Sequence, residues 1–168
     1  MNQLKPERLT YIGDRLRPLA DTVSIDEKVG LKVLCSPEKL LVAAKALKEA
    51  GFDHVVSVTG VDWPKQGRLD VVWHLSSYAD EELAGGIAQL SCSLPRENPT
   101  VSSLATVWES ATFQEREAFE MFGIEFQGHP DLRQLFLPEE LKGVWPLRKD
   151  FELKKRRDEF WRPRRSFQ

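Results

Sequence analysis

The feature of this 168-residue sequence that most limits its fold is an alternating segment at residues 68–76. Apolar side chains fall on every second residue there, as a strand with one buried face requires. A Pro-Lys-Gln-Gly turn precedes the segment at 64–67, and residues 55–63 before the turn also have strand character. Alternation returns at residues 88–94. We therefore predict two strands that meet at a turn, followed by a third strand of the same sheet.

The residues before these strands predict the rest of the sheet and its first helices. Residues 30–35 alternate like a further strand, and residues 4–17 have the spacing of a short amphipathic helix. Ser36-Pro37-Glu38 is typical of a helix start, and Gly51 of a helix end. The order of elements indicates an α+β fold, with a roughly four-stranded, mainly antiparallel sheet, helices packed on it and an extended C-terminal tail.

Beyond residue 100 the pattern becomes helical. Residues 104–108 have the apolar spacing of a short helix. Thr112 and Glu115 have the spacing of a capping box, which predicts a second helix that begins there and ends at Gly123. After residue 140 the sequence shows neither the period of a helix nor that of a strand. We therefore divide the chain into a domain at residues 1–141 and an extended basic and aromatic docking tail at 142–168.

The predicted tail and the rest of the chain carry opposite charges. Residues 142–168 hold 10 Lys and Arg against 4 Asp and Glu, whereas the whole chain has a net charge of −2. A basic, aromatic tail could bind nucleic acid, but acids interrupt this one and the body is acidic. A tail laid along an acidic groove of a protein partner suits the mixture better, and nucleic-acid binding is the remote alternative. The residues predicted to dock are Arg156, Arg157, Phe160, Trp161, Arg162 and Arg164.

The sequence offers little for catalysis or for a cofactor. His54, His74 and His129 are the only histidines, and no pair has the spacing of a metal site. His129, before Pro130 and Asp131, is the best candidate for an imidazole placed for function, and a hydrogen bond that fixes the loop explains it equally well. Cys35 and Cys92 are interpreted as buried core thiols, too few for an iron–sulfur cluster, which needs four ligands. A glycine-rich phosphate loop is also missing. We therefore predict no catalytic, cofactor-binding or metal-binding residue in this chain.

A charged and aromatic segment at residues 115–151 has the order of a family signature. It combines Glu-Arg-Glu at 115–117 with Glu-Met-Phe at 120–122, then His129, Arg133 and Trp-Pro-Leu-Arg-Lys-Asp-Phe at 145–151. This order resembles the NuoC-type subunit of respiratory complex I, also called the 30-kDa subunit or NdhJ. The segment at 94–101 is similar to the part of that family between sheet and helices. The residues predicted to form the signature and a protein interface are Glu115, Arg116, Glu117, Glu120, Phe122, His129, Arg133, Trp145, Pro146, Arg148, Lys149, Asp150 and Phe151.

The resemblance implies a non-catalytic structural subunit in the peripheral arm of a complex I-like NAD(P)H (or ferredoxin):quinone oxidoreductase. Such an enzyme couples electron transfer to proton or ion translocation. The chain would dock on the NuoD-type subunit, whose fold is that of a hydrogenase large subunit, and on other peripheral-arm subunits. It would bind no cofactor itself, while the assembled complex would contain iron–sulfur clusters and quinone, with FMN and NADH where NADH is the donor. The alternative is the equivalent subunit of a membrane-bound hydrogenase or of a deazaflavin-dependent dehydrogenase complex.

The sequence also predicts where such a subunit works. No stretch approaches the roughly 18 apolar residues that a membrane-spanning helix needs, and the N-terminus lacks the apolar core of a secretory signal. We therefore expect the chain on the cytoplasmic face of the energy-transducing membrane (the cell inner membrane or its equivalent). Its attachment to the membrane would come through other subunits.

Overall fold

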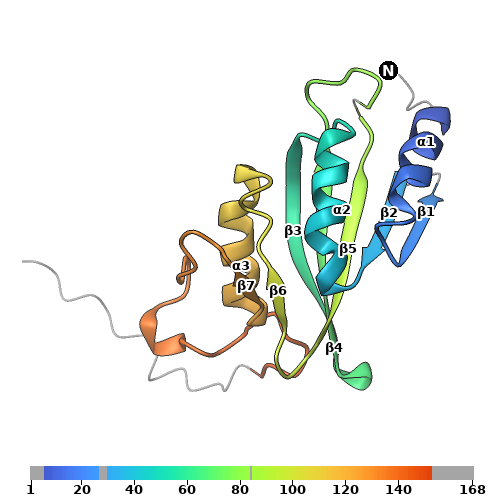
Figure 1. Cartoon of the computed structure of the whole chain (residues 1–168). Coiled ribbons are helices and arrows are strands. Elements are labelled where there is room, and N and C mark those ends of the chain that lie inside the picture. The colour runs from blue at the N-terminus through green and yellow to red at the C-terminus, as the bar shows by residue number, and fades with distance from the viewer. Residues whose placement is uncertain (1–5, 27–29, 84, 153–168) are drawn as a thin grey trace, which may run out of the picture.

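The α+β fold class predicted from the sequence is confirmed (Figure 1). A computed structural model describes residues 6–26, 30–83 and 85–152. Within these residues three α-helices accompany a five-stranded main sheet and a two-stranded small sheet. The elements are α1 (Pro6–Leu16), β1 (Thr22–Asp26), β2 (Gly30–Cys35), α2 (Pro37–Glu49), β3 (His54–Trp63), β4 (Arg68–Ser76), β5 (Ala88–Pro95), β6 (Thr100–Ser102), α3 (Thr112–Phe122) and β7 (Glu125–Gln127), with 3-10 turns at Pro64–Gln66, Glu109–Ala111 and Glu139–Leu141.

The strands of the main sheet lie in the order β1-β2-β5-β4-β3. β3 and β4 form the predicted antiparallel pair, in which Thr59 lies opposite Val72. Gly67 ends the turn between them with φ of 59°, a left-handed conformation that glycine adopts without strain. β2 and β5 run parallel, and the long connection that a parallel pair needs is formed by α2 and the β3–β4 pair.

The edge strand β1 was not predicted, so the main sheet has five strands rather than about four. Its five residues, Thr-Val-Ser-Ile-Asp, contain only two apolar side chains, and Ile25 stays 46% exposed. β1 is held mainly by its antiparallel pairing with β2, while Val23 is partly buried against the core. A short edge strand of this kind leaves little apolar pattern in a sequence.

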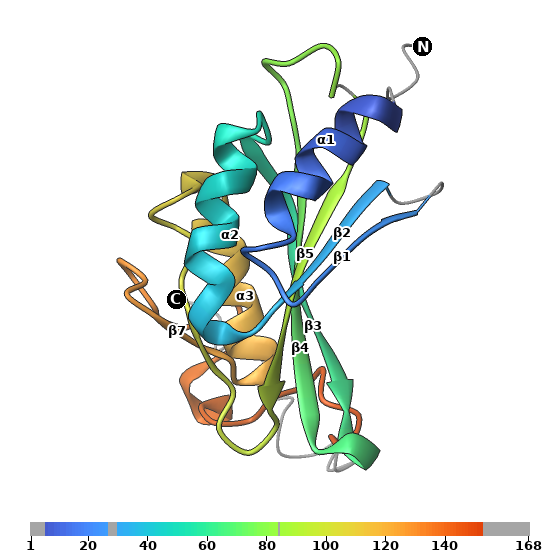
Figure 2. The same cartoon turned by 45° about the vertical axis from the view of Figure 1, so that its right-hand side comes forward.

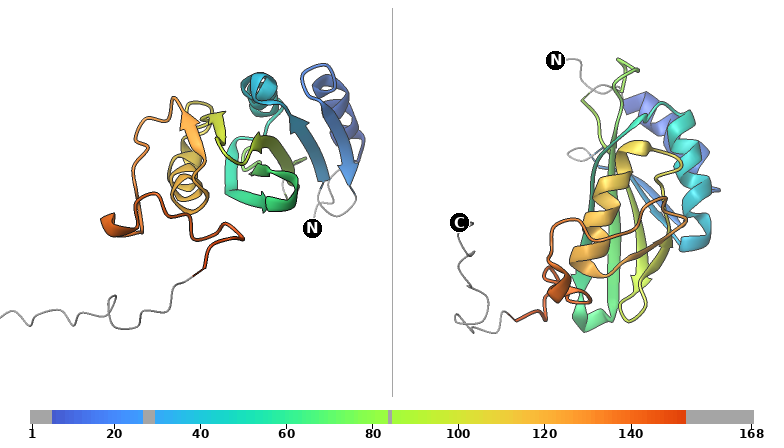
Figure 3. Two further views of the ribbon diagram at one scale, coloured as in Figure 1. Left: turned by 90° about the horizontal axis from the view of Figure 1, so that it is seen from below. Right: turned by 90° about the vertical axis from the view of Figure 1, so that its left-hand side faces the viewer.

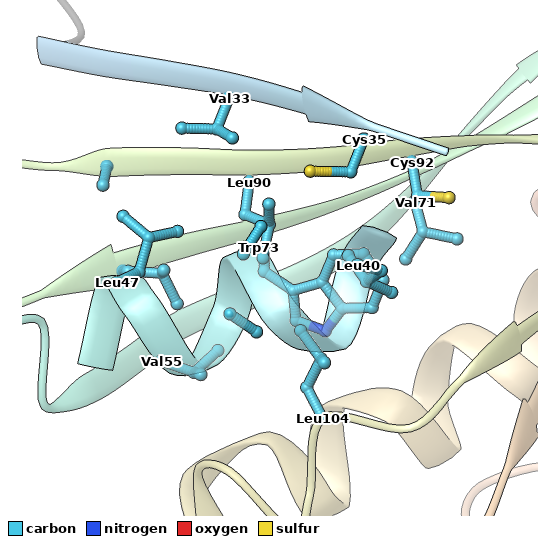
Figure 4. Packing of buried hydrophobic residues seen from close by; sticks show 14 of the residues in the cluster. Val33, Cys35, Leu40, Leu47, Val55, Val71, Trp73, Leu90, Cys92 and Leu104 are labelled. Atoms are coloured by element: carbon cyan, nitrogen blue, oxygen red, sulfur yellow. The ribbon is translucent and has the colours of Figure 1, made fainter. Parts of the chain in front are cut away.

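The helices gather on one face of the main sheet (Figures 2 and 3). α1 and α2 cover this face, and α3 packs against β3. The strand residues predicted to point inward, among them Val71, Trp73 and Leu75, are fully buried. They join Leu40 of α2 and Leu104 in a single apolar core (Figure 4). No helix of the described residues covers the opposite face.

Both cysteines are buried free thiols, as the sequence predicted. Cys35 and Cys92 lie opposite each other in the parallel pair of β2 and β5. Burial raises the pKa of Cys35 to about 11 and that of Cys92 to about 12. Both groups therefore stay protonated at neutral pH and behave as small core side chains.

The helix α2 begins and ends where the sequence predicted, although its N-terminus is bound differently. Pro37 is its first residue, and Gly51 follows it with φ of 112°. Ser36 makes no side-chain cap. Its backbone N–H instead donates to the carboxylate of Asp21. The acid thus binds a free N–H at the helix start, where a negative charge is favourable.

The prediction of a helix at residues 104–108 is wrong. The chain forms β6 up to Ser102 and then a turn, and β6 pairs in parallel with β7 in the small sheet. The helix-like spacing of apolar residues has another cause. The turn directs the side chains of Leu104 and Trp108 into the core, where both are buried. The indole Nε1 of Trp108 donates to the carbonyl of Phe52 over 2.8 Å. A few core residues at helical spacing are thus compatible with an irregular segment.

The prediction of a capping box is also wrong, although α3 starts at Thr112 as predicted. The Thr112 hydroxyl donates to the carbonyl of Glu109 over 2.7 Å, and the helix has no side-chain cap. Glu115 turns into the interior instead of back to the helix start. The end of α3 agrees with the prediction, because Gly123 has φ of 70° and its N–H donates to the Phe119 carbonyl.

Candidate functional site

The signature residue Glu115 is completely buried between α3, the main sheet and the turn after β6. Its carboxylate accepts hydrogen bonds from the hydroxyl of Ser103 at 2.6 Å and the N–H of Leu104 at 2.9 Å. The indole Nε1 of Trp73, in β4, donates to it over 3.2 Å. Burial raises the pKa of Glu115, and the three donors act in the opposite direction. The group therefore joins three parts of the fold.

Arg116 is the second buried charge of the signature and binds the loop after β7. Its guanidinium donates to the carbonyls of Arg133 and Gln134, each over 3.2 Å. The carboxylate of Asp131 lies 3.5 Å away, and the ring of Phe113 lies below the guanidinium at 5.5 Å. Arg116 thus holds the loop to α3 mainly through backbone carbonyls.

Glu120 does the same for the next part of the loop. It is 4% exposed, and its two carboxylate oxygens accept from the N–H groups of Phe136 at 2.8 Å and Leu137 at 2.7 Å. Glu117, one turn before it, points to solvent. Two of the three signature acids on α3, Glu115 and Glu120, are therefore used inside the fold.

His129 fixes the loop, which is one of the two interpretations that the sequence left open. Its Nε2 lies 3.0 Å from the carbonyl of Thr112, and its Nδ1 lies 3.0 Å from the N–H of Asp131. A carbonyl can only accept, and a backbone N–H can only donate. The geometry therefore makes Nε2 the donor and Nδ1 the acceptor of these two hydrogen bonds.

The second signature segment, residues 145–151, lies against the C-terminal end of α3. Arg148 is buried, and its Nε donates to the carbonyl of Phe122 over 2.8 Å. Its guanidinium also stacks 4.0 Å from the ring of Trp145. The same indole covers Gly123, where an added Cβ would lie 2.3 Å from the ring. A cation at this position also suits the negative end of the helix.

An ionic cluster then joins this segment to the main sheet. Asp62 accepts two hydrogen bonds from Arg96, at 2.7 and 3.1 Å, and one from the N–H of Lys149 at 2.8 Å. Arg96 also donates to Asp150 over 2.6 Å. Arg96 lowers the pKa of both acids. Lys149 lies above the ring of Trp63 at 5.1 Å.

Sequence reasoning missed Asp62 and Arg96. Arg96 stands inside the segment at 94–101 that is similar to the family, but nothing local marks it as an ion-pair partner. Asp62 was predicted only to lie in the strand at residues 55–63. A signal was present, since an acid at an inward position of an alternating strand needs a buried partner. The partner itself cannot be found without the fold.

The remaining predicted residues divide by burial. Phe122 is buried against β3, where an added Cβ on Gly60 would lie 2.6 Å from its ring. Pro146 and Phe151 are half-buried, and Arg133 is exposed. Within the predicted tail, contacts with the rest of the chain are made by Trp145, Leu147, Arg148, Lys149 and Asp150. The docking residues that lie outside the described residues are Arg156, Arg157, Phe160, Trp161, Arg162 and Arg164.

No group of three or more His, Cys, Asp or Glu side chains in residues 6–26, 30–83 and 85–152 could hold a metal ion. In the same part of the chain no helix has the length and apolar character needed to cross a membrane. What the signature residues form together is a brace between α3, its following loop and the main sheet.

Residues 33–157 match the family described as the respiratory-chain NADH dehydrogenase, 30 Kd subunit. The chain belongs to this family. The match begins within β2, at Val33, and includes every later element and all of the signature at 115–151. The resemblance seen in the sequence is therefore confirmed.

Two relatives illustrate the range of complexes in which similar subunits occur. Over 129 residues the chain is 37% identical to a subunit of the F(420)H(2) dehydrogenase of Methanosarcina mazei, covering 76% of this chain and 79% of the relative. Over 142 residues it is 38% identical to a subunit of the NADH-quinone oxidoreductase of Moorella thermoacetica, covering 82% and 91%. Both relatives are thus parts of larger enzymes.

Solved structures share the fold. A trypsin-resistant fragment of Nqo5, residues 1-134, superposes with a TM-score of 0.64 at 28% identity, covering 74% of this chain and 99% of the fragment. A chain of the membrane-bound sulfane sulfur reductase, described as an archaeal respiratory membrane complex, superposes with a TM-score of 0.77 at 22% identity, covering 96% and 94%. The second likeness is one of fold alone.

Proposed function

We propose that this chain is a non-catalytic structural subunit in the peripheral arm of a complex I-like oxidoreductase, where it docks on the NuoD-type subunit. One observation carries the proposal. The charged signature side chains Glu115, Arg116, Glu120 and Arg148 are buried and bind backbone groups of their own chain. A catalytic site needs polar groups that remain available to a substrate. Charges used in this way make the surface around α3 rigid, which suits a docking subunit.

The same proposal assigns the cofactors to other chains. Both thiols of this chain are buried in the main sheet, and an iron–sulfur cluster needs four ligands. The iron–sulfur clusters, the quinone and, with NADH as donor, FMN would belong to the partners. The chain would lie on the cytoplasmic face of the energy-transducing membrane and reach the membrane through those partners.

A second candidate differs in the electron donor. The relative from Methanosarcina mazei belongs to an F(420)H(2) dehydrogenase and is nearly as similar as the NADH-quinone relative. This chain could equally serve a deazaflavin-linked complex, because the residues that select the donor would lie on another subunit. The scaffold role is the same in both cases.

Affinity purification of the tagged chain from native membranes, under mild detergent, tests the proposal. We expect a NuoD-type protein and cluster-bearing chains in the eluate, and mass spectrometry of the remaining subunits identifies the donor. Recovery of a free, monomeric 19.3-kDa chain would contradict the scaffold role. Salt-dependent binding of DNA or RNA would favour the nucleic-acid alternative instead.

A further inference from the structure

An open groove of about 320 Å³ lies beside α3. One wall is the C-terminal half of α3, with Phe119 and Glu120. The other walls are two parts of the chain that follows it, residues 132–134 and 142–145. In the right-hand view of Figure 3 this chain, coloured orange to red, runs around α3. The groove therefore occupies the part of the molecule that the signature residues make rigid.

The surface of the groove is mainly apolar. Phe119, Leu132, Val144 and Trp145 line it. Phe136 lies next to this surface, since its backbone N–H donates to Glu120. Phe136 is nevertheless 63% exposed. Large apolar side chains that are exposed together mark binding surfaces more often than solitary ones do. A groove of this kind fits a large apolar side chain of an extended protein segment.

The charges at the groove are cationic. Three charged residues line it: Glu120, Arg133 and Lys142. The carboxylate of Glu120 is already used by two backbone N–H groups and is buried. Arg133 has a side chain that is 73% exposed and pairs with Asp131 through one nitrogen, which leaves further N–H donors. Lys142 is exposed and pairs with no acid within residues 6–26, 30–83 and 85–152.

We propose that this groove receives a segment of the NuoD-type partner in which a carboxylate stands beside a large apolar side chain. The inference rests on the proposed function, and it names the surface and the chemistry of the contact. The apolar side chain would enter between Phe119 and Trp145. The carboxylate would bind Lys142 and the free N–H groups of Arg133, where the available charge is positive.

A second groove, between α1 and α2, is less suited to bind the partner and serves as a control. It has a volume of about 330 Å³ and includes Arg8 and Arg15 on its wall. Arg8 is already paired with Asp80 at 3.0 Å. Its α1 residues lie outside the matched residues 33–157, whereas every residue that lines the first groove lies within them.

The test uses the full chain co-expressed with the NuoD-type subunit, and carbodiimide as a zero-length cross-linker. Carbodiimide joins a lysine amine to a carboxylate that touches it, with loss of water. We expect an inter-chain amide between Lys142 and an Asp or Glu of the partner, located by mass spectrometry. Lys142→Arg keeps the charge but removes the amine. It should abolish the cross-link, and because the positive charge remains, recovery of the complex should fall far less than with a reversal of the charge.

A charge reversal then measures the contribution to binding. We expect the double variant Arg133→Glu, Lys142→Glu to lower recovery of the partner at least tenfold, with an unchanged melting temperature of the isolated chain. Arg15→Glu, at the second groove, should leave recovery unchanged. If the unaltered chain forms the complex but Lys142 links to no partner carboxylate, or if the reversal has no effect, the groove is not the contact. Cross-links from Lys142 to residues 153–168 alone would place this chain's own tail there and would also overturn the proposal. If the unaltered chain does not bind the NuoD-type subunit at all, the proposed function itself fails.

Discussion

The backbone N–H of Lys149 donates to the carboxylate of Asp62 over 2.8 Å, although 87 positions of the chain separate the two residues. Asp62 stands at the end of β3, and its side chain is 1% exposed. The same carboxylate accepts two hydrogen bonds from Arg96. One buried acid therefore attaches the segment after α3 to the end of the main sheet. Trp145 and Arg148, which contact the end of α3, belong to the same attached segment.

The substitution Asp62→Asn should weaken the fold. It preserves the shape of the side chain but leaves the guanidinium of Arg96 without its buried counter-charge. We expect the free energy of unfolding to fall by about 3 kcal/mol, as when one partner of a buried ion pair is removed. Denaturation by urea, followed by circular dichroism, measures the loss. Asp150→Asn is the matched control, because this acid binds the same arginine but is 62% exposed, and it should change little.

The same pair predicts a dependence on acid. Arg96 holds the pKa of Asp62 below its ordinary value of 3.8. The unfolded chain then takes up the proton more readily than the folded one. The stabilisation is therefore complete above the unfolded pKa and is lost as the pH falls through the folded pKa. Below about pH 4 the unaltered chain should lose stability more steeply than Asp62→Asn does. Equal acid slopes for the two proteins would rule out this linkage.

A methyl group on Gly123 should displace Trp145. The residue has φ of 70°, and an added Cβ would lie 2.3 Å from the indole. We expect Gly123→Ala to cost about 3 kcal/mol or more, of which about 1 to 2 kcal/mol is the left-handed backbone alone. Gly67→Ala isolates that part, since Gly67 has φ of 59° and nothing within 4 Å of an added Cβ.

Trypsin reports on the displaced segment directly. Residues 145–151 contain Arg148 and Lys149, and Arg148 is buried against α3. Gly123→Ala should speed cleavage there, whereas Gly67→Ala should leave the rate unchanged. Equal unfolding energies for the two variants would show that the indole moves aside without loss.

Glu115 offers a test of a buried carboxylate that serves the fold. Glu115→Gln can still accept from Trp73 and Leu104, while its amide donates to the hydroxyl of Ser103. We expect it to stay within about 1 kcal/mol of the unaltered chain at neutral pH. Glu115→Ala leaves these buried donors without an acceptor and adds a cavity, so it should cost about 3 kcal/mol or more.

The pH dependence of Glu115 has the opposite sign to that of Asp62. Burial raises its pKa, so the folded chain holds this proton more tightly than the unfolded one. Its contribution to stability is greatest below the unfolded pKa and declines as the pH rises through the folded pKa. Glu115→Gln should remove this decline. A decline of the same size in the variant would assign it to another group.

The sequence is informative wherever one short segment determines its own structure. The β3–β4 pair follows from alternation and the turn that ends at Gly67, and α2 follows from Pro37 and Gly51. Such signals are local in origin. The edge strand β1 shows the limit, because backbone pairing with β2 replaces the apolar pattern that would reveal it.

The candidate site was predicted only as a set of residues. The sequence placed Glu115, Arg116 and Arg148 in one signature, but interpreted Glu115 as part of a helix cap, which the structure does not show. Their roles depend on partners 11 to 42 positions away, such as Leu104 and Trp73 for Glu115. A pattern in one segment cannot show whether its charges face solvent or a distant strand. The fold was needed to decide that.

Removing residues 153–168 should separate assembly from stability. The contacts of Trp145, Arg148 and Lys149 with the body are all made before this segment, so the shortened chain keeps them. We expect its melting temperature to stay within about 2 °C, because no described contact is lost. Recovery with the NuoD-type partner should fall, because the basic and aromatic residues predicted to dock are gone.

A longer deletion supplies the comparison for this prediction. Removing residues 145–168 also removes the indole over Gly123, the Arg148 bond to Phe122 and the Lys149 bond to Asp62. This variant should lose both stability and assembly. If the shorter deletion lowers the melting temperature as much as the longer one does, residues 153–168 pack on their own domain. If it instead leaves recovery of the partner unchanged, those residues do not dock.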